Sequence, residues 1–168
     1  MRTKSKHVIS AFAVLLSLCT SFWARQDLSL TTTDNAGLSL NSLRGRVVVL
    51  LFAGTADPQC RDEFKALAAL ADRYRGKSVN IYWVSLDPPA VSNEKLKNPC
   101  GPAGSITVLR DQSRNAFKRF SGRTQEMPTV VVLDQQGQPQ GQPRGGFNPD
   151  SDFVNDMAAI IDRLLSQK

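Results

Sequence analysis

The segment RVVVLLFA at residues 46–53 constrains the fold more than any other feature of the chain. A strand with solvent on one side alternates apolar and polar residues, so an unbroken apolar run indicates a strand that is buried on both faces of a sheet. Apolar residues then recur at helical spacing and predict a helix from about Pro58 to Arg75, which Gly76 ends. The next apolar segment, VNIYWVSL at residues 79–86, predicts a second strand. Strand, helix and strand in this order indicate a parallel pair joined by a crossover helix.

The other segments extend this alternation to both ends of the chain. Residues 28–40 alternate apolar and polar side chains around an Asn-Ala-Gly turn, which predicts an N-terminal β-hairpin. Short strands are expected at 106–109 and 129–133, with a short helix at 113–120 between them and a closing amphipathic helix over 153–165. The predicted fold class is therefore an α/β sandwich with a central mixed, largely parallel sheet and helices on both faces.

Charge and histidine content exclude several classes of function. The formal charge is +6, but without Arg2, Lys4 and Lys6 the chain has 18 basic and 15 acidic residues, a net charge of +3. These basic residues are scattered, so a nucleic-acid partner is not supported. The single histidine is His7. Metal sites with histidine ligands and Ser-His or Cys-His couples are excluded unless His7 folds back, and no metal or organic cofactor is implied.

Residues 1–24 have the pattern of an export signal. A basic stretch at 1–7 precedes an apolar stretch at 8–19 and then small residues, which is typical of a secretory signal peptide. Because residues 8–24 are an uncharged run of 17, a retained membrane anchor is the alternative, at the short limit for spanning. Either reading predicts a periplasmic or otherwise extracytoplasmic protein, with one folded domain over 25–168. Disulfides persist in such a compartment.

Five motifs, taken in order, resemble a known family. They are LRGR at 43–46, TADPQCR at 55–61, VSLD at 84–87, VLRD at 108–111 and MPT at 127–129. Their order and spacing are similar to those of the exported, membrane-tethered thiol–disulfide oxidoreductases of the TlpA/ResA group, within the redoxin or AhpC/TSA superfamily. The resemblance implies a thioredoxin fold and exchange with the thiols or disulfides of exported proteins.

The chain departs from this family at the attacking cysteine. In the family, the buried strand leads through a Trp-Cys-x-x-Cys turn into the first helix. Here Ala56 replaces the tryptophan, Asp57 replaces the first cysteine, and Cys60 keeps the second. Thiol–disulfide exchange needs one thiolate to open the substrate disulfide and a second thiol to resolve the mixed disulfide. A carboxylate does neither, so the ordinary two-cysteine cycle is not available at this turn, and Cys60 is the candidate catalytic thiol.

The topology predicts that Cys100 does not pair with Cys60. Cys60 follows the buried strand and so lies at the carboxyl end of the sheet, whereas Cys100 precedes the strand at 106–109 and is expected near the opposite end. A strand of five or six residues spans roughly 17–20 Å, far beyond the Cα separation of about 7 Å that a disulfide allows. Only a return of the proline-rich segment 88–105 would bring the two cysteines together.

Two interpretations of Cys60 stay open. Asp57 followed by Pro58 is a good helix start, with Asp57 as the N-cap and Cys60 at the third helical position. In the first interpretation, Asp57 accepts the backbone N–H of Gln59 or Cys60, and Cys60 is a small buried apolar residue. In the second, the helix N-terminus lowers the pKa of the Cys60 thiol and makes it reactive, an effect that the Asp57 carboxylate opposes.

Met127, Pro128 and Thr129 form the other site that the resemblance implies. In the family, the corresponding proline follows a cis peptide bond and faces the cysteine turn, and the backbone before it pairs with an extended substrate. The plain alternative is a proline that opens the strand. If the groove is retained, it can hold a peptide by strand pairing without any catalysis.

Three functions follow from these residues. In the first, Cys60 acts as a single thiol and forms a mixed disulfide that an external thiol resolves. In the second, the chain is a non-catalytic exported module that holds a partner polypeptide in the Met127–Thr129 groove. The third, a one-cysteine peroxidase, is the least supported: Asp57 stands where those enzymes have Thr or Ser, and the arginine they need would have to be Arg110 or Arg123.

Overall fold

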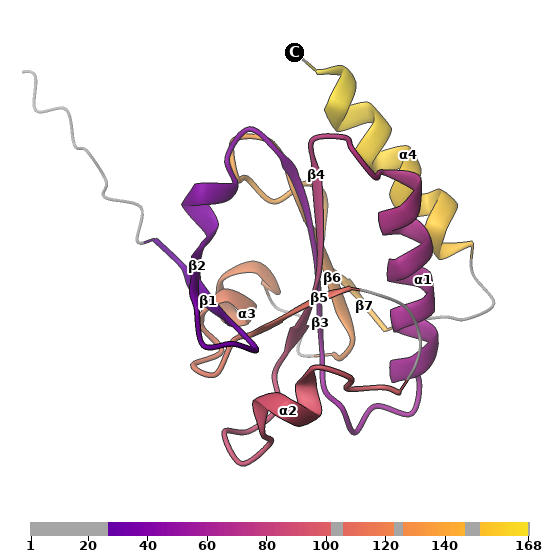
Figure 1. Ribbon diagram of the computed structural model, residues 1–168. Helices are drawn as coiled ribbons and strands as arrows, with labels where there is room; N and C mark the ends of the chain where they lie inside the picture. The colour runs from indigo at the N-terminus through magenta and orange to yellow at the C-terminus, as the bar shows by residue number, and fades with distance from the viewer. Residues whose placement is uncertain (1–26, 102–105, 123–125, 147–151, 168) are drawn as a thin grey trace, which may run out of the picture.

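A computed structural model of the chain describes residues 27–101, 106–122, 126–146 and 152–167, so the predicted export signal lies outside the described residues. The described chain forms one seven-stranded sheet with helices packed against it (Figure 1). The strands are β1 (Ser29–Thr32), β2 (Gly37–Ser39), β3 (Val47–Ala53), β4 (Val79–Ser85), β5 (Thr107–Arg110), β6 (Thr129–Leu133) and β7 (Arg144–Gly145). The helices are α1 (Cys60–Arg73), α2 (Asn93–Leu96), α3 (Asn115–Phe120) and α4 (Phe153–Ser166), with a short 3-10 helix, η1 (Leu40–Leu43).

The sheet has a parallel centre and antiparallel strands on both sides. Its strand order is β2-β1-β5-β4-β3-β6-β7. β3 pairs with β4, and β4 with β5, in the parallel sense. β6 is antiparallel to β3, and the β1–β2 hairpin is antiparallel to β5. The predicted mixed sheet and N-terminal hairpin are confirmed, although the parallel part is limited to three strands.

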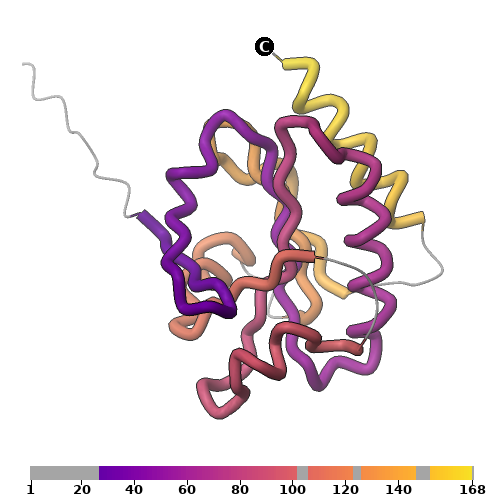
Figure 2. The backbone as a smooth tube through the Cα atoms, viewed as in Figure 1, coloured from indigo at the N-terminus to yellow at the C-terminus, as the bar shows by residue number. Residues whose placement is uncertain are grey.

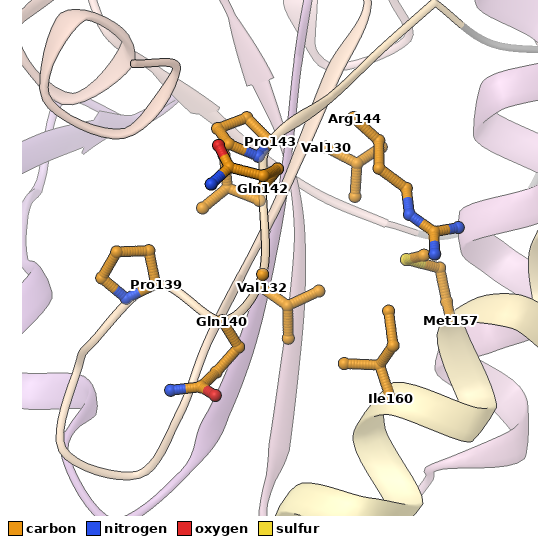
Figure 3. A pocket seen from close by; sticks show the side chains of 11 residues that line it. Val130, Val132, Pro139, Gln140, Gln142, Pro143, Arg144, Met157 and Ile160 are labelled. Atoms are coloured by element: carbon orange, nitrogen blue, oxygen red, sulfur yellow. The ribbon is translucent and has the colours of Figure 1, made fainter.

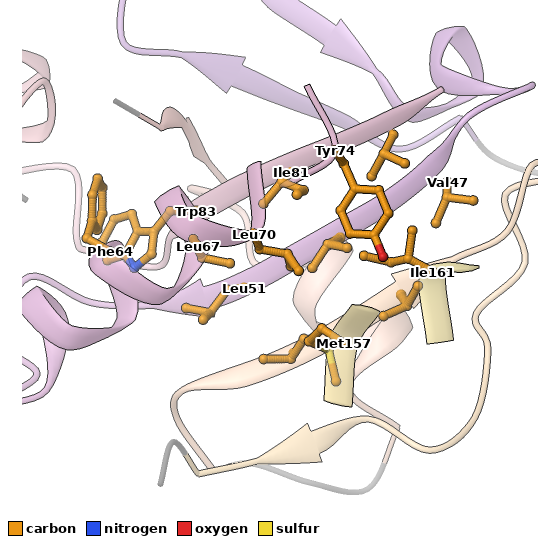
Figure 4. Close-up of a cluster of buried hydrophobic side chains, with 14 of the residues drawn as sticks. Val47, Leu51, Phe64, Leu67, Leu70, Tyr74, Ile81, Trp83, Met157 and Ile161 are labelled. Atoms are coloured by element: carbon orange, nitrogen blue, oxygen red, sulfur yellow. The ribbon is translucent and has the colours of Figure 1, made fainter. Parts of the chain in front are cut away.

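β3 is buried because both faces of the sheet are covered. Its odd-numbered residues, Val47 to Ala53, pack into a cluster with α1 and α4, and its even-numbered residues pack into a second cluster with α3 and the hairpin. Figure 1 shows α1 and α4 on one side of the sheet and α3 on the other. Figure 4 shows the first cluster, in which Trp83 of β4 lies against Phe64 of α1 at a centroid distance of 5.4 Å.

Helix α1 is shorter than predicted at both ends. It begins at Cys60 and ends at Arg73, and Gly76 follows in a left-handed turn, with φ +76°, that leads into β4. Near its end, the Tyr74 hydroxyl donates to the Ala158 carbonyl at 3.1 Å and to the Asp162 carboxylate at 2.8 Å, which fixes α1 against α4. Within the described ranges, no helix is both long and apolar enough to cross a membrane.

Candidate functional site

A disulfide joins Cys60 at the start of α1 to Cys100, with a Cα–Cα distance of 5.5 Å. The prediction that these two residues lie far apart is therefore wrong. β5 does not begin at the amino end of the sheet: Thr107 pairs with Tyr82, in the middle of β4. The start of β5 thus lies closer to the carboxyl end of the sheet than predicted. In Figures 1 and 2 the described residues after α2, up to Gly101, run toward the first turn of α1.

The proline-rich segment that carries Cys100 is anchored to the sheet and contains a short helix, α2. Leu96 of α2 is fully buried, and the Ser92 hydroxyl accepts the Lys95 N–H and caps this short helix. The buried Arg110 guanidinium donates to the Asn93 side chain at 2.5 Å and to the Pro88 carbonyl at 3.4 Å. These contacts hold residues 88–96 against the sheet, and Cys100 follows Leu96 by four residues.

Asp57 caps the turn before α1 and not the helix itself. Its carboxylate accepts the Gln59 N–H at 2.9 Å, and its backbone carbonyl accepts the Cys60 N–H at 3.1 Å. The residue before the helix, Gln59, has a helical backbone conformation and makes no side-chain cap. The predicted bond from the Gln59 N–H to the Asp57 carboxylate is therefore confirmed, but the helix begins at Cys60 and not at Pro58, because Asp57 closes a tight turn of its own before it.

The same turn is tied to the end of β4 through Asp87. This buried carboxylate accepts the Thr55 N–H at 3.0 Å, the Thr55 hydroxyl at 2.9 Å and the Ser85 hydroxyl at 2.9 Å. These bonds hold the β3–α1 turn against the neighbouring strand. Asp87 was not predicted as a site residue, although it closes the VSLD motif that contributes to the family resemblance.

Glu63 is an acidic residue in the first turn of α1, the helix that follows Asp57. It lies one helical turn after Cys60 and is fully buried. One carboxylate oxygen accepts the Trp83 indole N–H at 3.1 Å, and the other has no hydrogen-bond partner within the described part of the chain. Burial raises the pKa of Glu63 to about 7; the Trp83 hydrogen bond opposes this rise, and the negative charge of Asp57 adds to it.

Residues 127–129 lie at the same edge of the sheet as the cysteine turn. β6 is antiparallel to β3 with Thr129 opposite Phe52, so Pro128 and Met127 continue toward the end of β3. The Met127–Pro128 peptide bond is cis. Thr129 is fully buried and its hydroxyl donates to the Glu126 carbonyl, whereas Met127 is 46% exposed. The structure thus brings this segment near the turn.

Two hollows lie away from the disulfide. A cavity of about 20 Å³, enough for a single water molecule, lies between β6 and α4. Figure 3 shows Val132 and Met157 in its wall. A wider hollow of about 280 Å³ lies near the opposite end of α1, where Arg46, Arg75 and Lys77 line it. Across the described ranges, no three His, Cys, Asp or Glu side chains are placed to hold a metal ion.

The chain is similar to known proteins in both sequence and fold. The sequence model of the AhpC/TSA family matches residues 24–139. A curated relative, the thiol-disulfide oxidoreductase ResA of Halalkalibacterium halodurans, is 24% identical over 105 residues. This match covers 62% of the chain and 57% of the relative, so it spans less than two thirds of that protein.

Solved structures with the same arrangement of elements share low sequence identity with the chain. The exposed lipoprotein thioredoxin Etrx1 of Streptococcus pneumoniae has a TM-score of 0.66 at 20% identity, covering 82% of this chain and 99% of that one. A thiol:disulfide interchange protein of the thioredoxin family from Chlorobium tepidum has a TM-score of 0.64 at 19% identity, covering 83% of this chain and 94% of that one. The fold is the thioredoxin fold.

Proposed function

Because the chain belongs to the AhpC/TSA family, we propose that it exchanges thiols and disulfides with exported proteins through the Cys60–Cys100 pair. The disulfide between these residues is the observation that carries the proposal. Asp57 removes the first thiol of the usual Cys-x-x-Cys turn, yet Cys60 has a partner thiol from 40 positions further along the chain. Two thiols within bonding distance are what thiol–disulfide exchange requires.

The exchange moves two electrons between the protein and its substrate. With the pair oxidised, two substrate thiolates attack in turn: the Cys60–Cys100 bond breaks, a substrate disulfide forms, and two protein thiolates take up protons. With the pair reduced, the same steps run backwards and the substrate disulfide is opened. An external dithiol or disulfide then returns the pair to its starting state.

The surroundings of Cys60 influence which form is favoured. Cys60 is the first residue of α1, at the positive end of the helix dipole, which favours a thiolate. Asp57 in the preceding turn opposes this charge. Glu63 is neutral well below its pKa of about 7 and adds a second opposing charge only when it ionises. The ionisation of Glu63 near neutral pH therefore opposes a negative charge on Cys60.

The disulfide does not fit the single-thiol cycle that the sequence predicts. That cycle needs Cys60 to be free of any internal partner, whereas Cys100 is bonded to it. Peroxidase chemistry gains no support either. The Arg110 side chain is buried, and its two terminal nitrogens donate to Asn93 and to the Pro88 carbonyl; Arg123 lies outside the described residues.

A non-catalytic binding module is the second candidate function. Met127 is a large apolar side chain that is 46% exposed, next to Pro128 at the same edge of the sheet as the cysteine turn. An extended segment of a partner polypeptide could pair with the backbone there. In that case the Cys60–Cys100 disulfide would be a structural bond.

Export is part of the proposal. We assign residues 25–168 to one folded domain, and residues 1–24 to a signal peptide or, if residues 8–24 are retained, to a membrane anchor. The basic and then apolar pattern of the segment supports this assignment. The substrates would then be thiols or disulfides of extracytoplasmic proteins, and neither a nucleic acid nor a cofactor takes part.

Reduction of the disulfide in the folded protein tests the exchange function. The full chain, with Cys19→Ser so that two cysteines remain, is equilibrated with glutathione buffers of graded ratio. Alkylation and mass spectrometry then measure the Cys60–Cys100 bond while circular dichroism follows the fold. A redox protein is reduced reversibly while folded, and it catalyses reduction of insulin disulfides, which the Cys60→Ser/Cys100→Ser variant does not. A bond that resists reduction until the protein unfolds would instead support the binding module.

A further inference from the structure

The two sulfur atoms of the disulfide lie in unlike surroundings. We propose that Cys100 is the thiol that meets the substrate, that Cys60 is the buried thiol that resolves the mixed disulfide, and that Arg61 supports the Cys100 thiolate. The inference rests on the proposed exchange function and assigns roles within it.

The two cysteine residues differ in exposure. Cys60 is 5% exposed and belongs to the core cluster between α1 and the sheet. Cys100 is only partly buried, lies outside any helix or strand, and packs against the outside of the same cluster. An attacking thiolate reaches the sulfur that solvent can reach. The bond is therefore open to attack at Cys100 and closed to attack at Cys60.

Acidic side chains flank Cys60 on both sides. Asp57 precedes it in the turn, and Glu63 lies one helical turn after it and is neutral below its pKa of about 7. The guanidinium of Arg61, which follows Cys60 in the chain, lies beside the residue after Cys100. A Cβ placed on Gly101, the next residue, would lie 3.8 Å from the Arg61 guanidinium.

Arg61 is available to a thiolate. Within the part of the chain that the structure describes, its guanidinium takes part in no hydrogen bond or ion pair. A cation close to a cysteine favours the thiolate over the thiol. Arg61 is thus a positioning residue that would raise the fraction of Cys100 present as thiolate.

These roles give a two-step exchange with a substrate disulfide. The Cys100 thiolate attacks one sulfur of a substrate disulfide, a mixed disulfide forms, and the released substrate thiolate takes up a proton. Cys60 then loses its proton to solvent and attacks the Cys100 sulfur, which forms the Cys60–Cys100 bond and releases the second substrate thiolate. Two electrons pass from the protein to the substrate, and an external dithiol restores the protein. Cys60 keeps the resolving role that the family resemblance implies, and Cys100 takes the role of the missing first cysteine.

Single-cysteine variants of the full chain in the Cys19→Ser background test the assignment. The probe is 5,5′-dithiobis(2-nitrobenzoate), a small disulfide whose reaction with a thiol is followed by absorbance. Cys60→Ser, which leaves Cys100, is expected to react at least about tenfold faster than Cys100→Ser, which leaves the buried Cys60. Equal rates, or a faster Cys100→Ser variant, would overturn the assignment. If the unsubstituted pair is still reduced in the folded state, the exchange function stands regardless of this result.

Cys100→Ser could also loosen the loop and expose Cys60, so a second measurement uses both cysteines. The oxidised pair is treated briefly with reduced glutathione, quenched in acid and mapped by mass spectrometry. Glutathione attached to Cys100 supports the assignment, and glutathione attached to Cys60 contradicts it.

The role of Arg61 is tested by a pH profile in the Cys60→Ser background. Arg61→Gln should move the alkylation midpoint of Cys100 to higher pH and slow alkylation at pH 7 by about threefold, the equivalent of half a pKa unit. Arg61→Lys should restore most of the rate. Arg75→Gln, beyond the far end of α1, should leave the profile unchanged. An Arg61→Gln profile that coincides with that of its parent would overturn the role of Arg61.

Discussion

At the scale of single residues, the carboxyl group of Glu63 is the most unusual feature of the site. It is fully buried, one of its oxygens is bonded to Trp83, and its pKa is raised from 4.5 to about 7. The folded protein thus holds this proton more tightly than the unfolded chain does. Linkage then requires the free energy of unfolding to fall as the pH rises from about 4.5 to about 7, by about 3 kcal/mol, and to level off above that range.

Glu63→Gln should remove this pH dependence, because an amide cannot ionise. Thermal unfolding measured at intervals from pH 5 to pH 8 should give a falling Tm for the parent protein and a nearly constant Tm for the variant. At pH 8 the variant should be the more stable of the two. Glu94→Gln, at an exposed acid paired with Lys97, is the matched control and should follow the parent. Parallel curves for Glu63→Gln and the parent would contradict the raised pKa.

Two substitutions of Asp57 separate the effect of its hydrogen bond from the effect of its charge. Asp57→Ala removes the acceptor of the Gln59 N–H and should lower the free energy of unfolding by about 1 kcal/mol. Asp57→Asn keeps an acceptor and should cost only a few tenths of that amount, while removing the charge that opposes a Cys60 thiolate. Urea denaturation at pH 7 measures both variants. Equal losses for Ala and Asn would show that the charge, and not the hydrogen bond, stabilises the turn.

At the scale of elements, the Cys100 segment depends on a few contacts with the sheet. Arg110 of β5 donates to Asn93 and to the Pro88 carbonyl, and Asn93 also donates to Asn35 in the β1–β2 turn at 2.7 Å. Leu96 adds a fully buried apolar side chain. The hydrogen-bond partners Arg110 and Asn35 come from two other parts of the sequence, so these bonds leave no pattern in the segment itself.

Arg110→Met replaces the guanidinium with an apolar side chain of similar length. It should loosen the Cys100 segment, because the bonds to Asn93 and Pro88 are lost. Backbone amides of residues 93–98 should exchange with deuterium about tenfold faster, which corresponds to a local loss of about 1.4 kcal/mol. Amides of α1 and β3 should change little. Arg144→Met, which removes an exposed pair with Asp156, provides the control. Unchanged exchange at 93–98 would mean that Leu96 and the disulfide hold the segment without Arg110.

The elements also show what the sequence could and could not predict. The unbroken apolar run predicts β3 because a strand that is buried on both faces needs apolar residues at every position, and this pattern lies within one segment. The start of α1 was placed two residues early, because the rule for helix caps does not reveal that Asp57 closes its own turn. The position of Cys100 depends on the register of β5 against β4, and a register between distant strands leaves no local pattern.

At the scale of the whole molecule, the disulfide joins residues 40 positions apart and closes a loop that contains α1, β4 and α2. In the chain-entropy account, a cross-link of this length stabilises the fold by about 4 kcal/mol. A protein that cycles between oxidised and reduced forms must therefore stay folded after losing that contribution.

Reduction should lower the Tm by roughly 10 °C without changing the secondary structure at 25 °C. Scanning calorimetry with and without a dithiol reductant measures the shift. The Cys60→Ser/Cys100→Ser variant should match the reduced protein and should not respond to the reductant. Unfolding of the reduced form at 25 °C would make a redox cycle untenable and would favour a structural disulfide.

Because Cys60 and Cys100 lie far apart in the sequence, substitutions elsewhere in the fold can change the redox equilibrium of the pair. Two cysteines in one turn meet at an effective concentration set by that turn alone. Here the effective concentration of one thiol at the other is set by the tertiary contacts that hold α2 beside α1. Linkage makes the relation reciprocal: the free energy that the bond adds to the fold equals the free energy that the fold adds to the bond. Substitutions remote from both sulfur atoms, such as at Leu96, would therefore shift the redox equilibrium of the pair.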